Sequence, residues 1–457
     1  MGKLIWMLML FCLRSVSCSS PAIVSAQVTG SLEVEDFQPQ QIHIAIGESN
    51  QDIVITWVTP SETPLSVVEY GIGNIHSTAE GKSTKFTDGG LEHRTMWIHR
   101  VGLKSLEPNT RYMYHVGSPL GWSELFSFLT WEKEKTVHLT GPVRVAMFGD
   151  MGALNAQSLP RLQEEVFQEI YDAIIHVGDF AYDMDFENAR VGDQFMRQIQ
   201  PVAAYVPYMT CVGNHEQKYN FSNYRARFSM PNHEDTENLF FSWNMGPVHF
   251  ISISTEAYYF MEYGIKPLSR QYDWLIKDLE EATRPEVRAK VPWIILFGHR
   301  PMYCSNNDGD DCLRVDCLTR VGLPVVHTYG MEELLDKYGV DLAVWAHEHS
   351  YERLYPMFNY TVYNGSAEAP YTNPKAPVHI TTGSAGCDEV HDHFKHEQPH
   401  WSAFRSLDYG YTRVTAYNTT HLYWEQVSDD RNGEVIDKVW LIKDRHVSYP
   451  ELRSNHV

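Results

Sequence analysis

The spacing of hydrophobic residues changes near position 143 of this chain. Before it, residues 42–46 and 53–57 alternate apolar and polar side chains, which is the period-two pattern of strands with one buried face. Gly, Asn, Pro and Asp separate such segments at short intervals. The pattern predicts an all-β sandwich over residues 32–130.

After residue 143, apolar runs alternate with amphipathic segments. Residues 143–148 and 173–177 have the composition of buried strands, and a helix is expected at 159–173 because its apolar residues form one stripe. This β-α-β order predicts an α/β (α+β) domain over residues 143–426, with layered β-sheets flanked by helices. Further strands are expected at residues 248–253, 293–297, 342–346 and 378–382, and further helices at 272–282 and 331–338.

Two further segments complete the expected organisation. The length of 457 residues favours about three domains. Residues 131–142 are charged and end in Gly141-Pro142, so we expect a linker there. Residues 427–457 are expected to form a C-terminal extension whose end, after Asp444, lies at the surface.

The first residues have the pattern of a secretory signal. A short apolar run follows Lys3, and Val24-Ser25-Ala26 offers a small-residue cleavage site. No run approaches the roughly 18 apolar residues of a membrane span. We predict a signal peptide over residues 1–26 and a secreted, extracellular protein without a membrane span in the mature chain, while lysosomal routing and an N-terminal anchor stay open. Four N-x-S/T sequons agree with the secretory pathway, at Asn220, Asn359, Asn364 and Asn418.

Five cysteines follow the predicted signal, an odd number for an oxidising compartment. Three of them lie close together in sequence, so a disulfide that closes a local loop is expected, with its pairing open. Their spacing fits no structural zinc pattern. The five are Cys211, Cys304, Cys312, Cys317 and Cys387.

Composition and charge exclude several classes of protein. With 43% hydrophobic and 21% charged residues, the chain is not intrinsically disordered. The net charge of −21 argues against nucleic acid or an anionic membrane surface as the main partner. The same charge would repel an anionic substrate unless cations in the site dominate the local field.

Five short motifs lie at or just past the ends of predicted strands, where open α/β sheets bind their ligands. Each alone is common, because Gly-Asp turns and histidines on apolar strands occur in ordinary cores. Their succession in one chain, each with an oxygen or imidazole donor, predicts a single site. The motifs are Gly149-Asp150-Met151-Gly152, Gly178-Asp179-Phe180-Ala181-Tyr182, Gly213-Asn214-His215-Glu216, Gly298-His299-Arg300-Pro301 and Ala346-His347-Glu348-His349.

Together the motifs supply seven candidate metal ligands. A carboxylate that bridges two cations, flanked by imidazoles, suits a two-metal phosphoester site. The phenol of a tyrosine, once ionised, is a hard donor that favours Fe(III), which is a strong Lewis acid. The seven are Asp150, Asp179, Tyr182, Asn214, His299, His347 and His349.

On these motifs the chain resembles the purple acid phosphatases, within the metallophosphoesterases. The resemblance extends from Phe37 to near Gln426, and the Tyr182 of Gly178-Asp-x-x-Tyr is its most specific residue. It includes the N-terminal domain of the plant-type, two-domain members, and it is strongest to their animal homologues. Residues 103–114 also resemble the tyrosine corner of a fibronectin type III domain, which implies that fold for the N-terminal sandwich.

The resemblance implies two adjacent metal sites, with Asp179 bridging them. It places Fe(III) in the first site and Fe, Zn or Mn as M(II) in the second. It implies hydrolysis of small phosphate monoesters at acid pH by in-line attack of a metal-bound hydroxide, with His215 beside the ligands to bind phosphate or support the leaving group. The first site would use Asp150, Asp179, Tyr182 and His349, and the second Asp179, Asn214, His299 and His347.

The chain departs from the family pattern in two places. Ala346 replaces the usual glycine of the last motif, a change that we expect the site to tolerate. Asp308 and Gly309 stand where plant-type members carry two histidines, so the general acid is left open. We expect the histidines of residues 391–396 to lie in a solvated loop, and Arg353 to form a structural ion pair.

Two other functions stay open from the sequence. One keeps the metals but hydrolyses diesters or pyrophosphates of the nucleotide type. The other makes the chain an inactive binding protein that acts through its fibronectin-like domain. The oligomeric state is also open.

Overall fold

The computed structural model describes residues 34–131 and 142–454. The predicted signal peptide (residues 1–26), its cleavage site and nearly all of the predicted linker lie outside the described residues. From Val34 onward the chain forms one compact unit. Within the described residues, none of the helices combines the length and apolar character that a membrane crossing requires.

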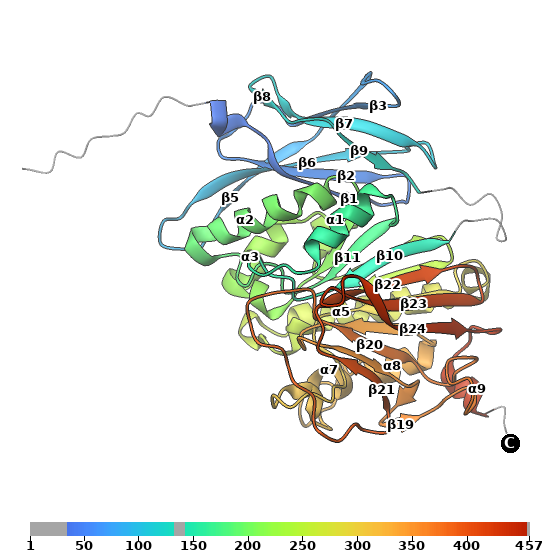
Figure 1. Cartoon of the computed structure of the whole chain (residues 1–457). Coiled ribbons are helices and arrows are strands. Elements are labelled where there is room, and N and C mark those ends of the chain that lie inside the picture. Colours follow the sequence, from blue (N-terminus) through green and yellow to red (C-terminus); the bar gives the residue numbers. More distant parts are fainter. Residues whose placement is uncertain (1–33, 132–141, 455–457) are drawn as a thin grey trace, which may run out of the picture. The chain divides into compact units, whose positions relative to one another are not determined.

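The N-terminal strands form two antiparallel sheets, blue to cyan in Figure 1. The first has the order β1-β2-β6-β5 and the second β4-β3-β7-β8, with β9 paired to β7. The Glu107 amide donates to the Tyr112 hydroxyl at 3.0 Å, as in a tyrosine corner. The strands are β1 (Gln40–Ile46), β2 (Ile53–Thr59), β3 (Val67–Gly71), β4 (Ser77–Glu80), β5 (Lys82–Thr87), β6 (Thr95–Leu103), β7 (Arg111–Ser118), β8 (Gly121–Trp122) and β9 (Phe126–Leu129).

A six-stranded sheet of order β12-β11-β10-β22-β23-β24 follows. Strands β10, β11 and β12 run parallel, and β22 joins β10 antiparallel, so segments far apart in sequence lie side by side (Figure 1). The strands are β10 (Val143–Phe148), β11 (Ala173–Val177), β12 (Tyr208–Cys211), β22 (Gly410–Ala416), β23 (His421–Ser428) and β24 (Glu434–Ile442).

A seven-stranded sheet of order β13-β14-β15-β16-β20-β17-β21 packs against it. Met147 and Trp424 of one sheet share a core with Phe297 and Val344 of the other. Strands β14, β15, β16 and β20 are parallel. The strands are β13 (Phe241–Met245), β14 (Val248–Ser252), β15 (Trp293–Phe297), β16 (Leu342–Trp345), β17 (Tyr351–Leu354), β20 (Val378–Thr382) and β21 (Ser402–Ser406), beside the small pair β18 (Met357–Phe358) and β19 (Thr361–Val362).

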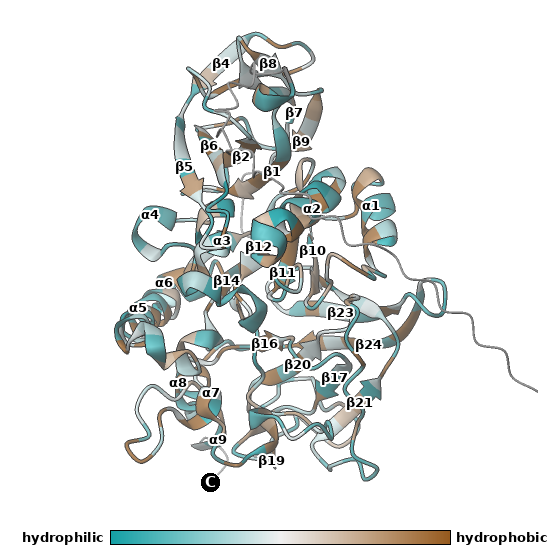
Figure 2. Cartoon of the chain, turned by 90° about the vertical axis from the view of Figure 1, so that its left-hand side faces the viewer, coloured by the Kyte–Doolittle hydropathy of each residue, from teal (hydrophilic) through white to brown (hydrophobic). Residues whose placement is uncertain are grey.

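Helices cover the outer faces of the sheets. Leu275 and Leu335 pack on the seven-stranded sheet in a second core. Brown and teal alternate around α1 and α2 in Figure 2, as expected for helices with one buried face. The helices are α1 (Leu159–Phe167), α2 (Phe186–Ala203), α3 (Lys218–Arg227), α4 (His233–Thr236), α5 (Lys266–Ala282), α6 (Pro285–Arg288), α7 (Leu318–Val321), α8 (Glu332–Tyr338) and α9 (Tyr449–Ser454).

The structure confirms the predicted fold class and corrects three expectations. The first helix ends at Phe167, before the expected residue 173, because Glu169 takes a positive φ of 59° and the chain turns into β11. The expected boundary between residues 426 and 427 does not exist, since β23 runs through it and pairs with β24. Beyond Asp444, Tyr449 is buried rather than at the surface.

A buried ion-pair network joins the N-terminal sandwich to helices α2 and α3. The Arg227 guanidinium donates to Asp193 Oδ1 at 2.8 Å and to Gln41 Oε1 at 3.0 Å. Gln41 also donates to Asp193 Oδ1 at 3.1 Å, and Arg94 pairs with the other carboxylate oxygen. Arg227 is only 1% exposed, so the network fixes polar groups that would otherwise be buried without partners.

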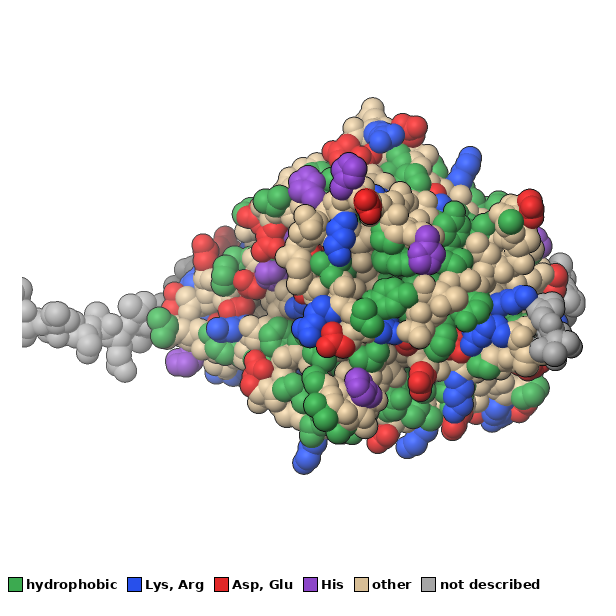
Figure 3. Space-filling model, turned by 90° about the horizontal axis from the view of Figure 1, so that it is seen from below, with side chains coloured by type: hydrophobic (Ala, Val, Ile, Leu, Met, Phe, Trp, Pro, Cys, Tyr) green, Lys and Arg blue, Asp and Glu red, His purple; other side chains and the backbone are tan. Residues whose placement is uncertain are grey.

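The net negative charge does not gather into one patch on the face seen in Figure 3. Acidic, basic and histidine side chains alternate over that face, with apolar side chains between them. The expected ion pair of Arg353 is present, because Asp437 on β24 accepts from its guanidinium at 2.6 Å.

Candidate metal centre

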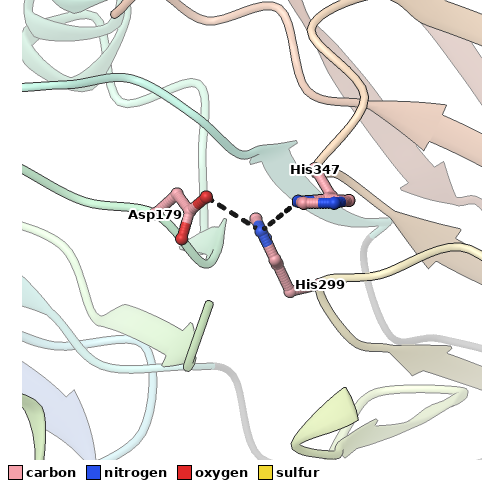
Figure 4. A group of neighbouring side chains, drawn as sticks. All are labelled: Asp179, His299 and His347. Carbon is pink, nitrogen blue, oxygen red and sulfur yellow. Dashed lines mark hydrogen bonds and ion pairs between the residues drawn. The ribbon is translucent and has the colours of Figure 1, made fainter. Parts of the chain in front are cut away.

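The five motifs follow the carboxyl ends of β10, β11, β12, β15 and β16, in both sheets. Because parallel strands present these ends at one edge, the motif side chains meet there. Asp179, His299 and His347 converge there, with one donor atom of each within 4.8 Å of the others. Figure 4 shows His299 between the other two.

His299 is the centre of this group. Its Nε2 lies 3.0 Å from Asp179 Oδ2, 3.1 Å from Asn214 Oδ1 and 3.2 Å from His347 Nδ1. Its Nδ1 lies 2.9 Å from the carbonyl oxygen of Val177, which is the usual anchor of a metal-binding imidazole. With Nδ1 donating there, Nε2 is the atom that faces three further acceptors, and once deprotonated it offers them a lone pair in common. This donor set fits a cation held between them.

A second group lies beside the first. The Tyr182 hydroxyl is 2.8 Å from His349 Nε2 and 3.2 Å from Asp150 Oδ1, and that imidazole nitrogen is 3.5 Å from the same carboxylate oxygen. The backbone amide of His347 donates to Asp150 Oδ2 at 3.0 Å and so connects the two groups. All seven residues singled out from the sequence therefore occupy one contiguous site.

Burial controls the protonation of the Tyr182 phenol. It raises the pKa of this group well above 10, and the negative charges of Asp150 and Asp179 raise it further. The metal-free chain therefore keeps the phenol protonated. A strong Lewis acid at this position would provide the free energy needed to ionise it.

Buried charge also acts on His299. Burial alone would lower its pKa, but the Asp179 carboxylate beside it prevails and raises the pKa to about 9. In the metal-free chain the pair of groups is thus an imidazolium and a carboxylate. A cation that binds here has to displace this proton, so binding becomes weaker as the pH falls.

Four of the seven predicted ligands have a strained backbone conformation. Asp150, Asp179, Tyr182 and His347 all have positive φ values, of 60°, 52°, 51° and 71°. Such conformations cost free energy and cluster at functional sites. Gly178 makes the close approach possible, because a Cβ there would lie 2.6 Å from His299 Nδ1 and its φ is +83°.

Glu216 is a functional residue that the sequence reasoning missed. Its buried carboxylate accepts the backbone amides of Asp179 and Gly213 at 3.0 Å each and that of Phe180 at 2.9 Å. It thereby holds the turn that presents the central carboxylate. Its position in the motif, directly after His215, was the available signal.

The sequence reasoning also assigned no role to Arg300 and Asp310. Nε2 of His347 lies 2.7 Å from the Arg300 guanidinium and 2.9 Å from Asp310 Oδ2. The guanidinium is fixed by Glu256 at 3.0 Å. These contacts engage Nε2 and leave Nδ1 of His347 facing the first group. Arg300 follows His299 directly, whereas nothing in the sequence indicated Asp310.

Asp310 belongs to the loop that a disulfide closes. Cys304 pairs with Cys312, which resolves the pairing left open by the sequence. Among the described residues, the thiols of Cys211, Cys317 and Cys387 are free and buried.

His215 lies next to the group, as expected. Its amide donates to Asp179 Oδ1 at 2.9 Å, its Nδ1 lies 2.9 Å from Asp183 Oδ1, and its ring packs on Tyr182 at 4.3 Å between centroids. Burial would lower the pKa of His215, but Asp179 and Asp183 raise it to about 10. Its Nε2 faces away from Asp183, towards Glu389 at 3.8 Å.

The two departures from the family pattern have structural outcomes. At the positions of the missing histidine pair, Asp308 is exposed and Gly309 turns the chain with a φ of +92°. Ala346 is buried where a glycine is usual. Its methyl group is accommodated by Gly149, at which a Cβ would come within 2.3 Å of it.

The expectation that residues 391–396 form a solvated loop is only partly correct. His391 Nδ1 lies 3.1 Å from the carbonyl oxygen of His349, and Asp392 Oδ2 accepts the His349 amide at 2.6 Å. The first part of the loop is therefore docked on the site, while His396 is exposed. Of the sequon asparagines, Asn364 is half-buried and the others are exposed, at Asn220, Asn359 and Asn418.

Paired sheets that place such donors at their carboxyl ends define a metal-dependent phosphoesterase. A family model described as calcineurin-like phosphoesterase matches residues 143–351. Models described as purple acid phosphatase, N-terminal domain, and iron/zinc purple acid phosphatase-like protein C match residues 39–130 and 376–438. The chain belongs to the purple acid phosphatase family.

Similar proteins agree over most of the chain. An acid phosphatase type 7 from Danio rerio is 56% identical over 415 residues, 90% of this chain and 92% of the relative. One from Homo sapiens is 50% identical over 424 residues, 92% of this chain and 94% of the relative. A purple acid phosphatase from yellow lupin (Lupinus luteus) seeds shares the fold, with a TM-score of 0.73 at 24% identity over 89% of this chain and 75% of that chain.

These matches confirm the family, the phosphatase class of enzyme and the use of iron with a divalent metal. They leave the individual ligands, the location of the protein and its substrate as predictions.

Proposed function

We propose that the chain is a secreted enzyme that hydrolyses phosphate monoesters at acid pH at a centre of Fe(III) and one divalent metal. The observation that carries the proposal is the contiguous set of seven donors, in which His299 Nε2 faces three further acceptors and Tyr182 lies against His349 and Asp150. A set that combines one phenol, two carboxylates, three imidazoles and an amide suits two unlike cations.

The proposed iron ligands are Asp150, Asp179, Tyr182 and His349, and the proposed ligands of the divalent ion are Asp179, Asn214, His299 and His347. Asp179 is suited to both, since its two oxygens point to different neighbours, Oδ2 to His299 and Oδ1 to the amide of His215. When bound, the cations supply Lewis acidity to the phosphoryl group and to the attacking water.

The remaining residues of the site position and neutralise charge. Glu216 fixes the turn of Asp179, and Arg300 with Asp310 fixes the ring of His347. Asp183 orients the ring of His215 through Nδ1, which leaves Nε2 to donate to a phosphate oxygen or to the leaving group. In the absence of the family's histidine pair, His215 is the residue that we assign to this role.

The decisive experiment is a visible spectrum with metal analysis of the protein secreted from a eukaryotic host. We expect iron and a second metal in equal amounts and a visible band from tyrosinate-to-iron charge transfer. Tyr182→Phe should abolish this band, whereas Tyr423→Phe, on the distant strand β23, should retain it. A colourless protein with stoichiometric iron, or an intact band in Tyr182→Phe, would refute the assignment.

Activity assays on the same preparations test the substrate class. The proposal predicts faster turnover of an aryl phosphate monoester than of the matching diester or of a pyrophosphate, with an optimum below pH 7. Asp179→Asn should abolish turnover. N-terminal sequencing of the secreted protein tests the predicted cleavage after Ala26.

A further inference from the structure

A second cluster of acidic side chains lies beside the candidate metal centre. Asp308, Glu348 and Asp392 each offer one carboxylate oxygen, and these atoms lie within 4.8 Å of one another. They come from three segments: the loop closed by the Cys304–Cys312 disulfide, the turn between His347 and His349, and the loop after β20. None of the three is used by the proposed phosphatase site.

Glu348 is the unusual member of this cluster. It is 1% exposed, and its Oε2 has no hydrogen-bond partner within the described residues. Its Oε1 lies 2.9 Å from Cys312 Sγ, and this sulfur has no hydrogen to donate because it is in the disulfide. A buried carboxylate without any donor is costly unless a cation meets it.

The other two carboxylates also keep an oxygen free. Asp308 Oδ1 accepts the Asp310 amide at 3.1 Å, and Asp392 Oδ2 accepts the His349 amide at 2.6 Å. Over residues 34–131 and 142–454, no Lys or Arg forms an ion pair with any of the three. Among the described residues, His349 beside Asp392 is therefore the cationic side chain that acts on the cluster, and no Lys or Arg neutralises Glu348.

A neutral side chain next to the cluster also has an oxygen without a partner. Asn306 donates through Nδ2 to the carbonyl oxygen of Asp392 at 2.7 Å and to Ser350 Oγ at 2.9 Å. Its Oδ1 is buried and has no partner among the described residues. Two buried oxygens without donors, Asn306 Oδ1 and Glu348 Oε2, thus accompany a cluster of three carboxylates.

We propose that Asp308, Glu348 and Asp392 bind a Ca²⁺ ion, separate from the two catalytic metals. The donors are all oxygens, which hard cations prefer, and no imidazole or thiolate is present to favour zinc. The ligands come from three separate loops and turns with irregular geometry, which Ca²⁺ accepts and Mg²⁺, with its strict octahedral shell, does not. The ion would tie the disulfide loop to the loop of residues 391–396 beside His347 and His349.

The test is equilibrium dialysis of the iron- and zinc-loaded enzyme, prepared free of calcium, against radioactive Ca²⁺. We expect one bound Ca²⁺ per chain, with a Kd at or below about 1 mM, the range of extracellular calcium modules. Asp308→Asn and Asp392→Asn should each weaken binding by about tenfold or more. The matched control is Asp316→Asn, an exposed residue of the same chain segment that pairs with Arg314 and should bind like wild type.

Thermal unfolding provides a second readout that does not require an active enzyme. Saturating Ca²⁺ should raise the Tm of the wild type and of Asp316→Asn, and should not raise that of Asp308→Asn. Unchanged binding in both Asp308→Asn and Asp392→Asn overturns the assignment of ligands. Binding of Mg²⁺ as tightly as Ca²⁺ overturns the choice of ion.

Absence of Ca²⁺ binding up to about 10 mM, well above the expected Kd of about 1 mM, overturns the proposal. That result favours a proton shared between Glu348 and a neighbouring carboxylate. Iron and zinc content and phosphatase turnover are measured on the same samples. If the metals or the turnover are absent while Ca²⁺ binds, the result counts against the proposed function alone. If the metals and the turnover are present while Ca²⁺ does not bind, the result counts against the calcium site alone.

Discussion

Replacing Asp193 by Asn tests whether the buried network between the N-terminal sandwich and the catalytic domain stabilises the fold. The substitution keeps the shape of the side chain and removes its charge. Arg227, 1% exposed, would lose its only carboxylate partner within the described residues and keep neutral acceptors at Asn223, Gln41 and Ala189. Arg94 would lose the same partner at the edge of the network.

The expected loss follows from the burial of the pair. Breaking a buried ion pair by removing one partner costs about 3–5 kcal/mol, because the other charge stays buried. That is a large share of the about 5–15 kcal/mol by which a domain is usually stable. The assay is denaturant unfolding at pH 7, followed by tryptophan fluorescence. Glu286→Gln, at a fully exposed ion pair with Arg284, is the control and should leave the midpoint unchanged.

A double substitution separates the charge from the packing. Asp193→Leu with Arg227→Met removes both charges and should recover most of the lost stability, since an apolar pair of similar volume replaces a buried ion pair at little cost. If Asp193→Asn unfolds at the same midpoint as the control, the buried network contributes nothing and the reasoning fails. Because the arginines hold the pKa of Asp193 below its usual value against the opposing effect of burial, this contribution should persist down to about pH 4.

Two other predictions concern the site and the response to acid. Glu216→Gln places an amide NH₂ against backbone amides that now donate to a carboxylate, so we expect a loss of about 10- to 100-fold in metal affinity or turnover; the exposed Glu164→Gln should behave like wild type in the same titration. Burial lowers the pKa of His379 to about 3, and Trp345 donates to its Nδ1 at 3.1 Å, so the folded state resists the proton that the unfolded chain takes up below pH 6.5. The contribution of His379 to the free energy of unfolding is therefore fully present above pH 6.5. As the pH falls from 6.5 towards 3, this contribution decreases by about 1.4 kcal/mol per pH unit. The slope of unfolding free energy against pH between 6 and 4 should be smaller by about one proton in His379→Gln; equal slopes in the two proteins would contradict the assignment.

The sequence predicted the fold best where one pattern dominates. Strands β10, β11, β15 and β20 have the predicted bounds. The last three are buried along their whole length, and β10 is buried except at Arg144. Strand β24 was missed because it is largely half-buried at a sheet edge, where the apolar pattern weakens, and its Asp437 faces inward to meet Arg353.

The candidate site divides in a similar way. Donors that sit in motifs after strands, such as Asp179 and His299, could be found because their types and order are specific. Glu216 accepts backbone amides of the turn that carries Asp179, and Arg300 contacts the imidazole ring of His347. Only the three-dimensional structure reveals such contacts. The carboxylates of Asp308, Glu348 and Asp392 come together from three segments, so no single stretch of sequence contains the cluster.

The charge of the chain gains a more specific meaning from the site. Asp150, Asp179 and an ionised Tyr182 would place three negative charges at the centre, in a chain whose net charge is already −21. Without metals the phenol stays protonated and His299 and His215 carry protons, so this charge develops only as the cations bind. Cations with a combined charge of about +5 reverse the sign of the local field, and over a few ångströms they outweigh the distant surface charge. The bound cations should therefore strengthen binding of the substrate as well as assist the chemical step.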